Sequence, residues 1–290
     1  MSQPGYAIPR SVQEAVETLA RSTAARPIAG GTDLMVQMRL GHRRPDVVVD
    51  TRAIEELHLL RQGDPTVIGA AVTLRRFLGD AELTGSYPAL AQAANLLGGR
   101  QIQAVATFGG NVCNASPAAE TATPLLVYAA QAVIESRGGR REVPLTAFFT
   151  GPGKTVVDAG ELLVGLHLPP PTGDERSAYR RLELRRSVDI AVVSASSWVR
   201  VVEGRIATAR VAVGAVNAVA MRVPAAEATL TGVEVDDSRA VERAIAQAAV
   251  DCRDASRPID DTRASAQYRL AMVELIARRA LNDTILTGAH

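Results

Sequence analysis

A proline- and glycine-rich stretch near the middle of the chain most constrains how it can fold. It reads Pro169-Pro170-Pro171-Thr172-Gly173-Asp174, which can continue neither a helix nor the centre of a sheet. Such stretches are typical of linkers between domains. With 290 residues, the chain is long enough for two domains. The sequence therefore predicts one domain over residues 1–173 and a second over residues 174–290.

The patterns on the two sides of this linker differ. Before it, Ser11 and Glu14 form a capping box that opens an amphipathic helix through Ala20. Strands are predicted there at 46–50, 66–72, 131–136, 140–143 and 162–168. Two further helices are predicted at 73–78 and 88–97. After the linker, strands at 178–184, 190–202 and 206–216 precede helices at 225–230, 238–250 and 261–286. Strands followed by helices indicate an α+β fold.

Composition and charge exclude several classes of protein. Hydrophobic residues make up 47% of the chain, which excludes a disordered protein. The 32 basic residues nearly balance the 31 acidic ones, so no general attraction to nucleic acid or to an anionic membrane is expected. No apolar run approaches the ~20 residues that span a bilayer, and the first residues lack an apolar signal core. We expect a cytoplasmic protein without a membrane span.

The few cysteines and histidines argue against a metal centre in this chain. Cys113 and Cys252 are its two cysteines, whereas an iron–sulfur cluster needs about four cysteine ligands. The four histidines show no spacing typical of a zinc site. If the protein carries out redox chemistry, we therefore expect an organic cofactor.

Two glycine pairs are the strongest candidates for a binding site. Gly30-Gly31 follows an apolar approach and precedes Thr32, and Gly109-Gly110 likewise precedes Asn111. Consecutive glycines tolerate positive φ angles, so neighbouring backbone N–H groups can point into one concavity that binds phosphate oxygens. Thr32, Thr107 and Asn111 add polar side chains. Two such loops could hold the two phosphates of a pyrophosphate.

Familiar nucleotide-binding motifs are absent from the sequence. The GxGxxG pattern of Rossmann folds does not occur in it. Gly153-Lys154-Thr155 resembles the end of a P-loop, but Phe148 stands where that motif needs a glycine, and Pro152 removes a backbone donor. We interpret this stretch as a surface turn.

Several segments together resemble a known family. The stretches Ile28 to Leu34 and Thr107 to Glu120, the second of which contains Gly-Gly-Asn-x-x-Asn-Ala-Ser-Pro, are similar to the FAD-binding subunits of molybdenum hydroxylases, the family of xanthine dehydrogenase and carbon monoxide dehydrogenase. Tyr179 to Ala191, Pro258 to Arg263 and Tyr268-Arg269 continue the resemblance. It implies a two-lobed FAD-binding domain of the PCMH/vanillyl-alcohol-oxidase-like type, followed by a smaller domain of three antiparallel strands and helices.

The resemblance also implies roles for individual residues. The first loop would wrap the pyrophosphate of a non-covalent FAD, and the second would contact it from the other side. Glu120, where the family usually has Asp, would bind a sugar hydroxyl, and Arg181, where the family has Lys, would reach the flavin region. The implied cofactor-binding residues are Ile28, Ala29, Gly30, Gly31, Thr32, Asp33, Leu34, Met35, Thr107, Gly109, Gly110, Asn111, Glu120, Leu163, Val164 and Arg181. No catalytic side chain and no metal ligand is predicted.

The function implied by the resemblance is electron transfer within a heterotrimer. A large subunit with a molybdenum cofactor would oxidise the substrate, and a small [2Fe-2S] subunit would pass electrons to this chain. Electrons would then leave to NAD⁺, O₂, a quinone or another acceptor. Two alternatives stay open: a free-standing flavin oxidase of a small alcohol with the related fold, and a binding module that has lost flavin.

Overall fold

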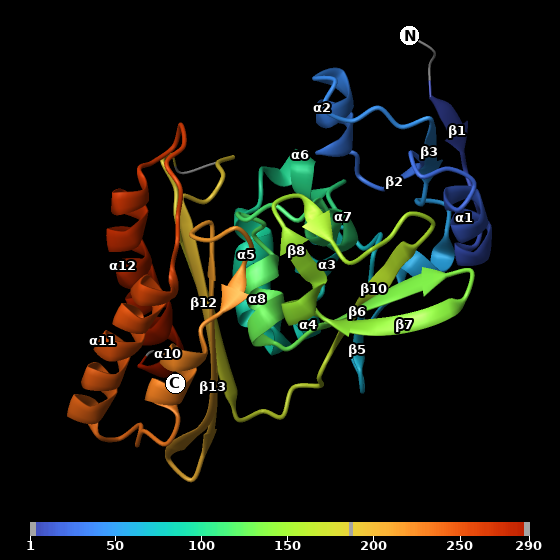
Figure 1. Ribbon diagram of the computed structural model, residues 1–290. Helices are drawn as coiled ribbons and strands as arrows, with labels where there is room; N and C mark the ends of the chain where they lie inside the picture. Colours follow the sequence, from blue (N-terminus) through green and yellow to red (C-terminus); the bar gives the residue numbers. More distant parts are fainter. Residues whose placement is uncertain (1–3, 186–187, 287–290) are drawn as a thin grey trace. The chain divides into compact units, whose positions relative to one another are not determined.

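The computed structural model describes residues 4–185 and 188–286 (Figure 1). The chain divides into two compact units, and each unit is built from separate stretches. Within the described residues, unit 1 contains the chain up to Asp80 together with Gly99–Ala115 and Ala130–Pro170. Unit 2 contains Ala81–Gly98, Ser116–Ala129 and the chain from Pro171 onward.

Unit 1 is built around two sheets. The smaller one is parallel and has β3 between β1 and β2; its strands are β1 (Gly5–Ala7), β2 (Arg26–Ile28) and β3 (Val47–Asp50). The larger one is antiparallel in the order β4-β5-β10-β6-β7; its strands are β4 (Leu60–Arg61), β5 (Thr66–Gly69), β6 (Gln131–Ser136), β7 (Gly139–Pro144) and β10 (Leu162–Leu168). The helices are α1 (Val12–Leu19), α2 (Leu34–Arg39), η1 (Glu55–His58), α3 (Leu74–Leu78), α6 (Arg100–Gln103), α7 (Phe108–Asn114) and α9 (Leu145–Phe148).

Local sequence signals explain several of these elements. The Ser11 Oγ accepts a hydrogen bond of 3.1 Å from the Glu14 N–H, which caps α1 as the sequence predicts. The Glu14 carboxylate accepts from the Arg10 N–H and not from that of Ser11, so only half of the predicted capping box forms. The P-loop-like stretch is a short hairpin of β8 (Phe149–Gly151) and β9 (Lys154–Thr155), which confirms the predicted surface turn.

Unit 2 is a sheet with helices on both faces. The antiparallel strands β11 (Glu175–Leu182), β12 (Val193–Val202), β13 (Arg205–Gly214) and β14 (Met221–Arg222) follow one another in order. The helices α10 (Pro224–Leu230), α11 (Ser238–Ala255) and α12 (Ala266–Ile285) cover one face (Figure 1). The helices α5 (Pro88–Leu96) and α8 (Ala122–Val127) pack on the same sheet, with α4 (Ala81–Ser86) beside α5. The predicted strand meander followed by helices is confirmed.

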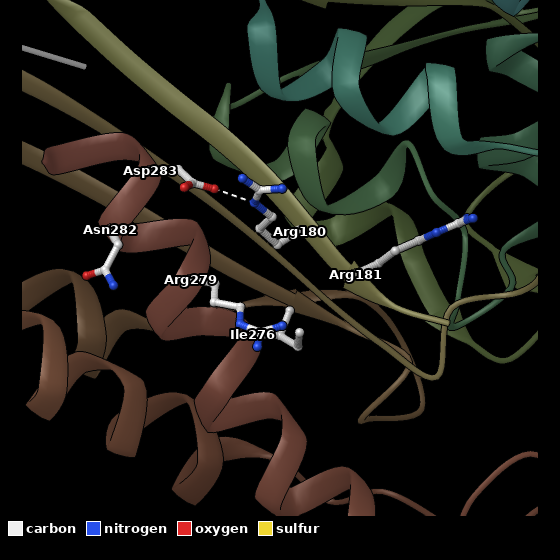
Figure 2. A pocket seen from close by; sticks show the side chains of 6 residues that line it. All are labelled: Arg180, Arg181, Ile276, Arg279, Asn282 and Asp283. Carbon is white, nitrogen blue, oxygen red and sulfur yellow. Dashed lines mark hydrogen bonds and ion pairs between the residues drawn. The ribbon is translucent and has the colours of Figure 1, made fainter. Parts of the chain in front are cut away.

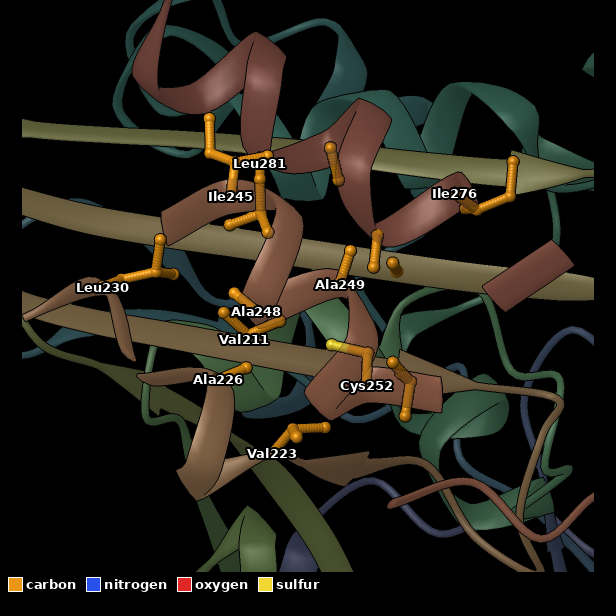
Figure 3. Close-up of a cluster of buried hydrophobic side chains, with 14 of the residues drawn as sticks. Val211, Val223, Ala226, Leu230, Ile245, Ala248, Ala249, Cys252, Ile276 and Leu281 are labelled. Carbon is orange, nitrogen blue, oxygen red and sulfur yellow. The ribbon is translucent and has the colours of Figure 1, made fainter. Parts of the chain in front are cut away.

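The core of unit 2 lies between β12, β13 and the C-terminal helices (Figure 3). Every third or fourth residue of α11 is apolar, so Val241, Ile245, Ala248 and Cys252 all face this core. The helix predicted from residue 261 begins only at Ala266, because the Ser265 Oγ caps it. Residues before this cap form a loop.

Candidate functional site

The first glycine pair lies in a loop whose backbone N–H groups are unpaired; we call them the open donors. Ile28 ends β2, and Leu34 begins α2. Among the described residues, the N–H groups from Ala29 to Leu34 have no hydrogen-bond acceptor, and neither the Thr32 nor the Asp33 side chain has a partner. Gly31 has φ = +67°, a left-handed conformation that glycine adopts at little cost. Since no group of the described chain occupies these N–H groups and the loop is not buried, they can donate to a bound anion.

The loop rests directly on the chain that leads into the second glycine pair. A Cβ placed on Gly30 would lie 2.0 Å from the Val105 carbonyl oxygen, so only glycine fits there. Farther along, the Gln37 side chain of α2 donates a hydrogen bond of 3.1 Å to the Asn114 side chain of α7. The two glycine pairs therefore lie in neighbouring segments of unit 1, as binding to one ligand requires.

The second glycine pair does not form an open loop, which corrects the sequence-based expectation. Gly109 and Gly110 lie in the first turn of α7, which Thr107 caps. The Phe108 and Gly109 N–H groups donate to the carbonyls of Val72 and Ala70. The next two N–H groups, of Gly110 and Asn111, donate to Thr107 Oγ1 and the Thr107 carbonyl, both at 3.0 Å. Since all these donors are occupied, this turn offers no backbone nest.

Close packing explains why a glycine stands at position 109. Its Cβ would lie 2.6 Å from the Ala70 carbonyl oxygen, so a side chain would push α7 away from the turn after β5. The sequence analysis explained this glycine by a positive φ angle. The structure shows a different reason, because the backbone of Ala70 lies too close to leave room for a side chain. No sequence pattern identifies Ala70, Val72 or Val105 as part of this region, because each contributes a backbone carbonyl and not a side chain.

The predicted residues of β10 join the same cluster. The Ala70 N–H donates to the Val164 carbonyl at 2.8 Å, while the Ala70 carbonyl accepts from Gly109 at 3.0 Å. The pairing of β10 with β6 shifts register between Leu163 and Gly165, so Val164 sits at a bulge. Bulges often occur beside binding sites because they redirect the chain. Leu163 and Val164 are both buried.

Glu120 and Arg181 belong to unit 2 and bind each other. Arg181 Nη1 lies 2.6 Å from Glu120 Oε1, and Arg181 also pairs with Glu183. Tyr179 is fully buried and donates its hydroxyl hydrogen bond to the other Glu120 oxygen. Burial raises the pKa of the Glu120 carboxyl, and the positive charge of Arg181 opposes that shift. One donor in the cluster, Arg181 Nε, is buried without an acceptor in the described chain.

This arrangement differs from the expectation that Glu120 and Arg181 contact the cofactor separately. Both oxygens of Glu120 already accept hydrogen bonds from the chain. Tyr179, which the sequence analysis names only as part of a segment that resembles the family, belongs to the cluster. Its position two residues before Arg181 on β11 was the available signal, because alternate strand residues share a face. A direct contact of Glu120 or Arg181 with FAD stays a prediction.

A small hollow of about 240 Å³ lies on the opposite face of β11 (Figure 2). Arg180 and Asp283 form an ion pair at its edge, and Arg279 and Asn282 line it from α12. Arg181 also lines the hollow, although its side chain extends away from Arg279 and Asn282 in Figure 2.

The described residues contain neither a candidate metal site nor a helix that could span a membrane. No group of three or more His, Cys, Asp or Glu side chains in them is placed to hold a metal ion. In the part of the chain that the structure describes, every helix is too short or too polar to cross a bilayer.

Comparisons with known proteins agree with these observations. The family model for the FAD binding domain in molybdopterin dehydrogenase matches residues 2–171, and the model for the CO dehydrogenase flavoprotein C-terminal domain matches residues 177–284. The xanthine dehydrogenase FAD-binding subunit of Escherichia coli O157:H7 is 30% identical over 280 residues, which covers 95% of this chain and 94% of that protein. The carbon monoxide dehydrogenase medium chain of Hydrogenophaga pseudoflava is 30% identical, with 96% and 95% covered.

Solved structures are similar over nearly the whole chain. A chain of carbon monoxide dehydrogenase from Hydrogenophaga pseudoflava superposes with a TM-score of 0.92 at 29% identity, covering 99% of this chain and 98% of its own length. A chain of quinoline 2-oxidoreductase from Pseudomonas putida 86 gives 0.91 at 28% identity, covering 100% and 99%. The predicted fold is thereby confirmed. The protein belongs to the family of FAD-binding medium subunits of molybdenum hydroxylases; it is an oxidoreductase flavoprotein subunit, and its cofactor is FAD.

Proposed function

We propose that the open backbone donors between β2 and α2 hold the FAD pyrophosphate. The observation that carries this proposal is the row of N–H groups from Ala29 to Leu34 without acceptors in the described chain. Gly31 adopts the left-handed conformation at which the loop turns. Gly30 has no side chain, which lets the loop pack directly against the Val105 carbonyl. The loop needs no basic side chain, because several N–H dipoles together stabilise a negative charge.

The turn at Thr107 and the bulge at Val164 support this loop. In this proposal α7 contributes the side chains of Thr107 and Asn111, since its first N–H groups are already occupied. Leu163 and Val164 border the same region from β10, where the Val164 carbonyl accepts from the Ala70 N–H. FAD, when bound, supplies a group that takes up and releases electrons. The residues of this chain position it and shield it from water.

We further propose that the subunit works in a heterotrimer. Two cysteines cannot hold the clusters that would deliver electrons, which supports a separate [2Fe-2S] subunit. Relatives are named medium chains and FAD-binding subunits, which supports a large molybdenum-cofactor partner as well. Electrons would pass from the [2Fe-2S] clusters through this subunit to NAD⁺, O₂, a quinone or another acceptor.

The substitution Gly30→Ala tests whether this loop binds FAD. In Gly30→Ala the new Cβ collides with the Val105 carbonyl, so the loop must shift. We expect FAD affinity, measured by flavin fluorescence titration, to fall at least about tenfold, which is about 1.4 kcal/mol. Gly85→Ala in α4 is the matched control, because its Cβ meets nothing within 4 Å, and its affinity should equal that of the wild type. An unchanged affinity in Gly30→Ala contradicts the assignment of the loop.

The heterotrimer is tested by purification of the tagged chain from its native cells. The co-eluting proteins should contain iron and molybdenum by elemental analysis. If instead the chain elutes alone and oxidises a small alcohol without partners, the flavin oxidase alternative is correct and the heterotrimer is wrong.

A further inference from the structure

Helix α2 packs on the rest of unit 1 through one side only. The half-buried residues of this helix are Leu34, Gln37 and Met38, whose spacing places them on a single face. On this face the Gln37 side chain donates to the Asn114 side chain of α7. Within the described chain, α2 has only sparse contacts with other helices and strands, and none of its residues is fully buried (Figure 1). The opposite face of α2 is therefore left uncovered by the described residues.

The uncovered face of α2 is apolar, which reverses the usual pattern of a surface helix. It consists of Met35, Val36, Arg39 and Leu40, and we call it the α2 face. Met35 is 40% exposed, Val36 50% and Leu40 64%. Single exposed apolar residues are common, but a contiguous apolar patch with a polar rim marks an interaction surface. A helix of six residues is also too short to be stable by itself, so a partner on this face would stabilise it.

Positive charge surrounds the α2 face. Residues 35–45 contain three arginines and no acidic residue, although the chain as a whole has a net charge of only +1. All three arginines are exposed. Arg43 donates to the Gln37 side chain at 3.4 Å, and the side chains of Arg39 and Arg44 have no partner among the described residues. A protein that covers the α2 face therefore needs carboxylates around an apolar centre.

This charge pattern selects among the possible occupants. In a two-fold contact between copies of this chain the same patch would meet itself, so the arginines would repel one another. A membrane fits poorly, because Arg39 lies beside Val36 and Leu40, whereas helices bound to membranes keep their charges on the opposite face. An acidic protein surface can contact both kinds of side chain, since arginine is common inside protein interfaces. The α2 face is therefore suited to a partner protein.

The position of α2 indicates which partner binds there. Leu34, the last residue with an open donor, is also the first residue of α2. A protein bound to α2 thus lies next to the proposed site of the FAD pyrophosphate. In the proposed heterotrimer the [2Fe-2S] subunit passes electrons to FAD, and electron transfer requires the donor and the acceptor to come close. This favours the [2Fe-2S] subunit over the large subunit.

We propose that the α2 face binds an acidic surface of the [2Fe-2S] subunit. Val36 and Leu40 form the apolar centre of the contact, and Arg39, Arg43 and Arg44 form its charged rim. Burial of the centre stabilises the complex, while the rim attracts and orients the partner. This inference rests on the proposed heterotrimer and adds the surface of this chain through which one partner binds.

The first test measures how tightly the [2Fe-2S] subunit binds the full-length chain loaded with FAD. That subunit is separated from the native complex, and its affinity is measured by surface plasmon resonance. Leu40→Asp places a negative charge in the apolar centre, opposite the partner's carboxylates, so we expect the affinity to fall at least about tenfold. Leu59→Asp is the matched control, because Leu59 is an exposed leucine of unit 1 outside α2. Its affinity should equal that of the wild type.

The second test concerns the charged rim. The double variant Arg39→Gln, Arg44→Gln removes two positive charges that have no partner in the described chain. At low ionic strength we expect the [2Fe-2S] subunit to associate more slowly, by about threefold or more, with little change in its dissociation rate. Arg21→Gln, at an exposed arginine outside this segment, is the control and should associate at the wild-type rate.

The FAD affinity of the same variants separates docking from damage to the neighbouring loop. Leu40→Asp should bind FAD as the wild type does, because the Leu40 side chain is exposed. If it does not, Leu40→Gln takes its place, since glutamine keeps the length of the side chain and adds no charge. Leu40→Gln should then weaken binding of the [2Fe-2S] subunit and leave FAD affinity unchanged.

The inference is wrong if the Leu40 variant binds the [2Fe-2S] subunit as tightly as the wild type does, or if Leu59→Asp loses as much affinity. It is also wrong if the tagged Leu40 variant, purified from native cells, loses molybdenum but keeps iron. Binding of the wild type to phosphatidylserine vesicles that Leu40→Asp abolishes, with iron still retained, would assign the face to a membrane instead. Failure of the proposed function looks different, because the wild-type chain then elutes without any iron-containing protein.

Discussion

At the scale of single residues, one glycine pair serves two separate needs. Gly31 adopts a left-handed conformation, whereas Gly30 leaves room for the Val105 carbonyl oxygen. The sequence marks both as turn-forming glycines, but it cannot separate the two reasons, because close approach depends on a residue far along the chain. Gly109 shows the same limit, since its neighbour Ala70 lies on another segment.

The buried cluster around Glu120 gives a prediction at this scale. Tyr179→Phe removes the hydroxyl that donates to Glu120 and leaves one buried carboxylate oxygen without that partner. We expect the free energy of unfolding at neutral pH to fall by about 1–3 kcal/mol. Urea unfolding followed by the fluorescence of Trp198, the single tryptophan of the chain, measures this change. Tyr268→Phe, at an exposed tyrosine, should change nothing.

The pH dependence of this loss has a definite sign. Burial, opposed by Arg181, raises the pKa of Glu120, so the fold favours the protonated carboxyl. Stability from such a group is complete below its ordinary pKa and is lost as the pH rises through the raised one. Removing the Tyr179 hydroxyl raises that pKa further. The difference between Tyr179→Phe and the wild type should therefore grow from mild acid to neutral pH, and a difference that shrinks would contradict the assignment.

At the scale of elements, local signals predicted the longer strands and helices but missed several short ones, among them β1, β2, α2 and α8. The meander of unit 2 and the hairpin of β6 and β7 follow from alternating apolar residues and turn residues, which act within a few positions. Helix α7 was not predicted, because Gly109 and Gly110 are poor helix formers. It forms because Thr107 caps it and because Val72 and Ala70 accept its first N–H groups. These tertiary contacts have no signature in the sequence around α7.

At the scale of the whole molecule, the order of segments in the chain hides the division into units. The predicted boundary at residues 173 and 174 stays a prediction. The stretch Ser116–Ala129 lies between two stretches of unit 1 in sequence but belongs to unit 2. Its helix α8 packs on β12 and β13. Family resemblance supplied Glu120 and Arg181 as candidates, yet their mutual ion pair required the fold to bring residues 120 and 181 together.

The account depends most on the open donors of the first loop, and backbone hydrogen exchange tests them directly. Exchange is measured by mass spectrometry on the full-length chain with and without saturating FAD. Peptides covering residues 29–34 report the open loop, and peptides covering 108–111 serve as an internal control, because those N–H groups already have partners. Unpartnered amides exchange fast, and a bound acceptor slows them.

We predict that residues 29–34 exchange rapidly without FAD and become strongly protected when it binds, while residues 108–111 are protected in both states. If FAD binds and the exchange of residues 29–34 does not change, the pyrophosphate is held elsewhere and the assignment of this loop is wrong.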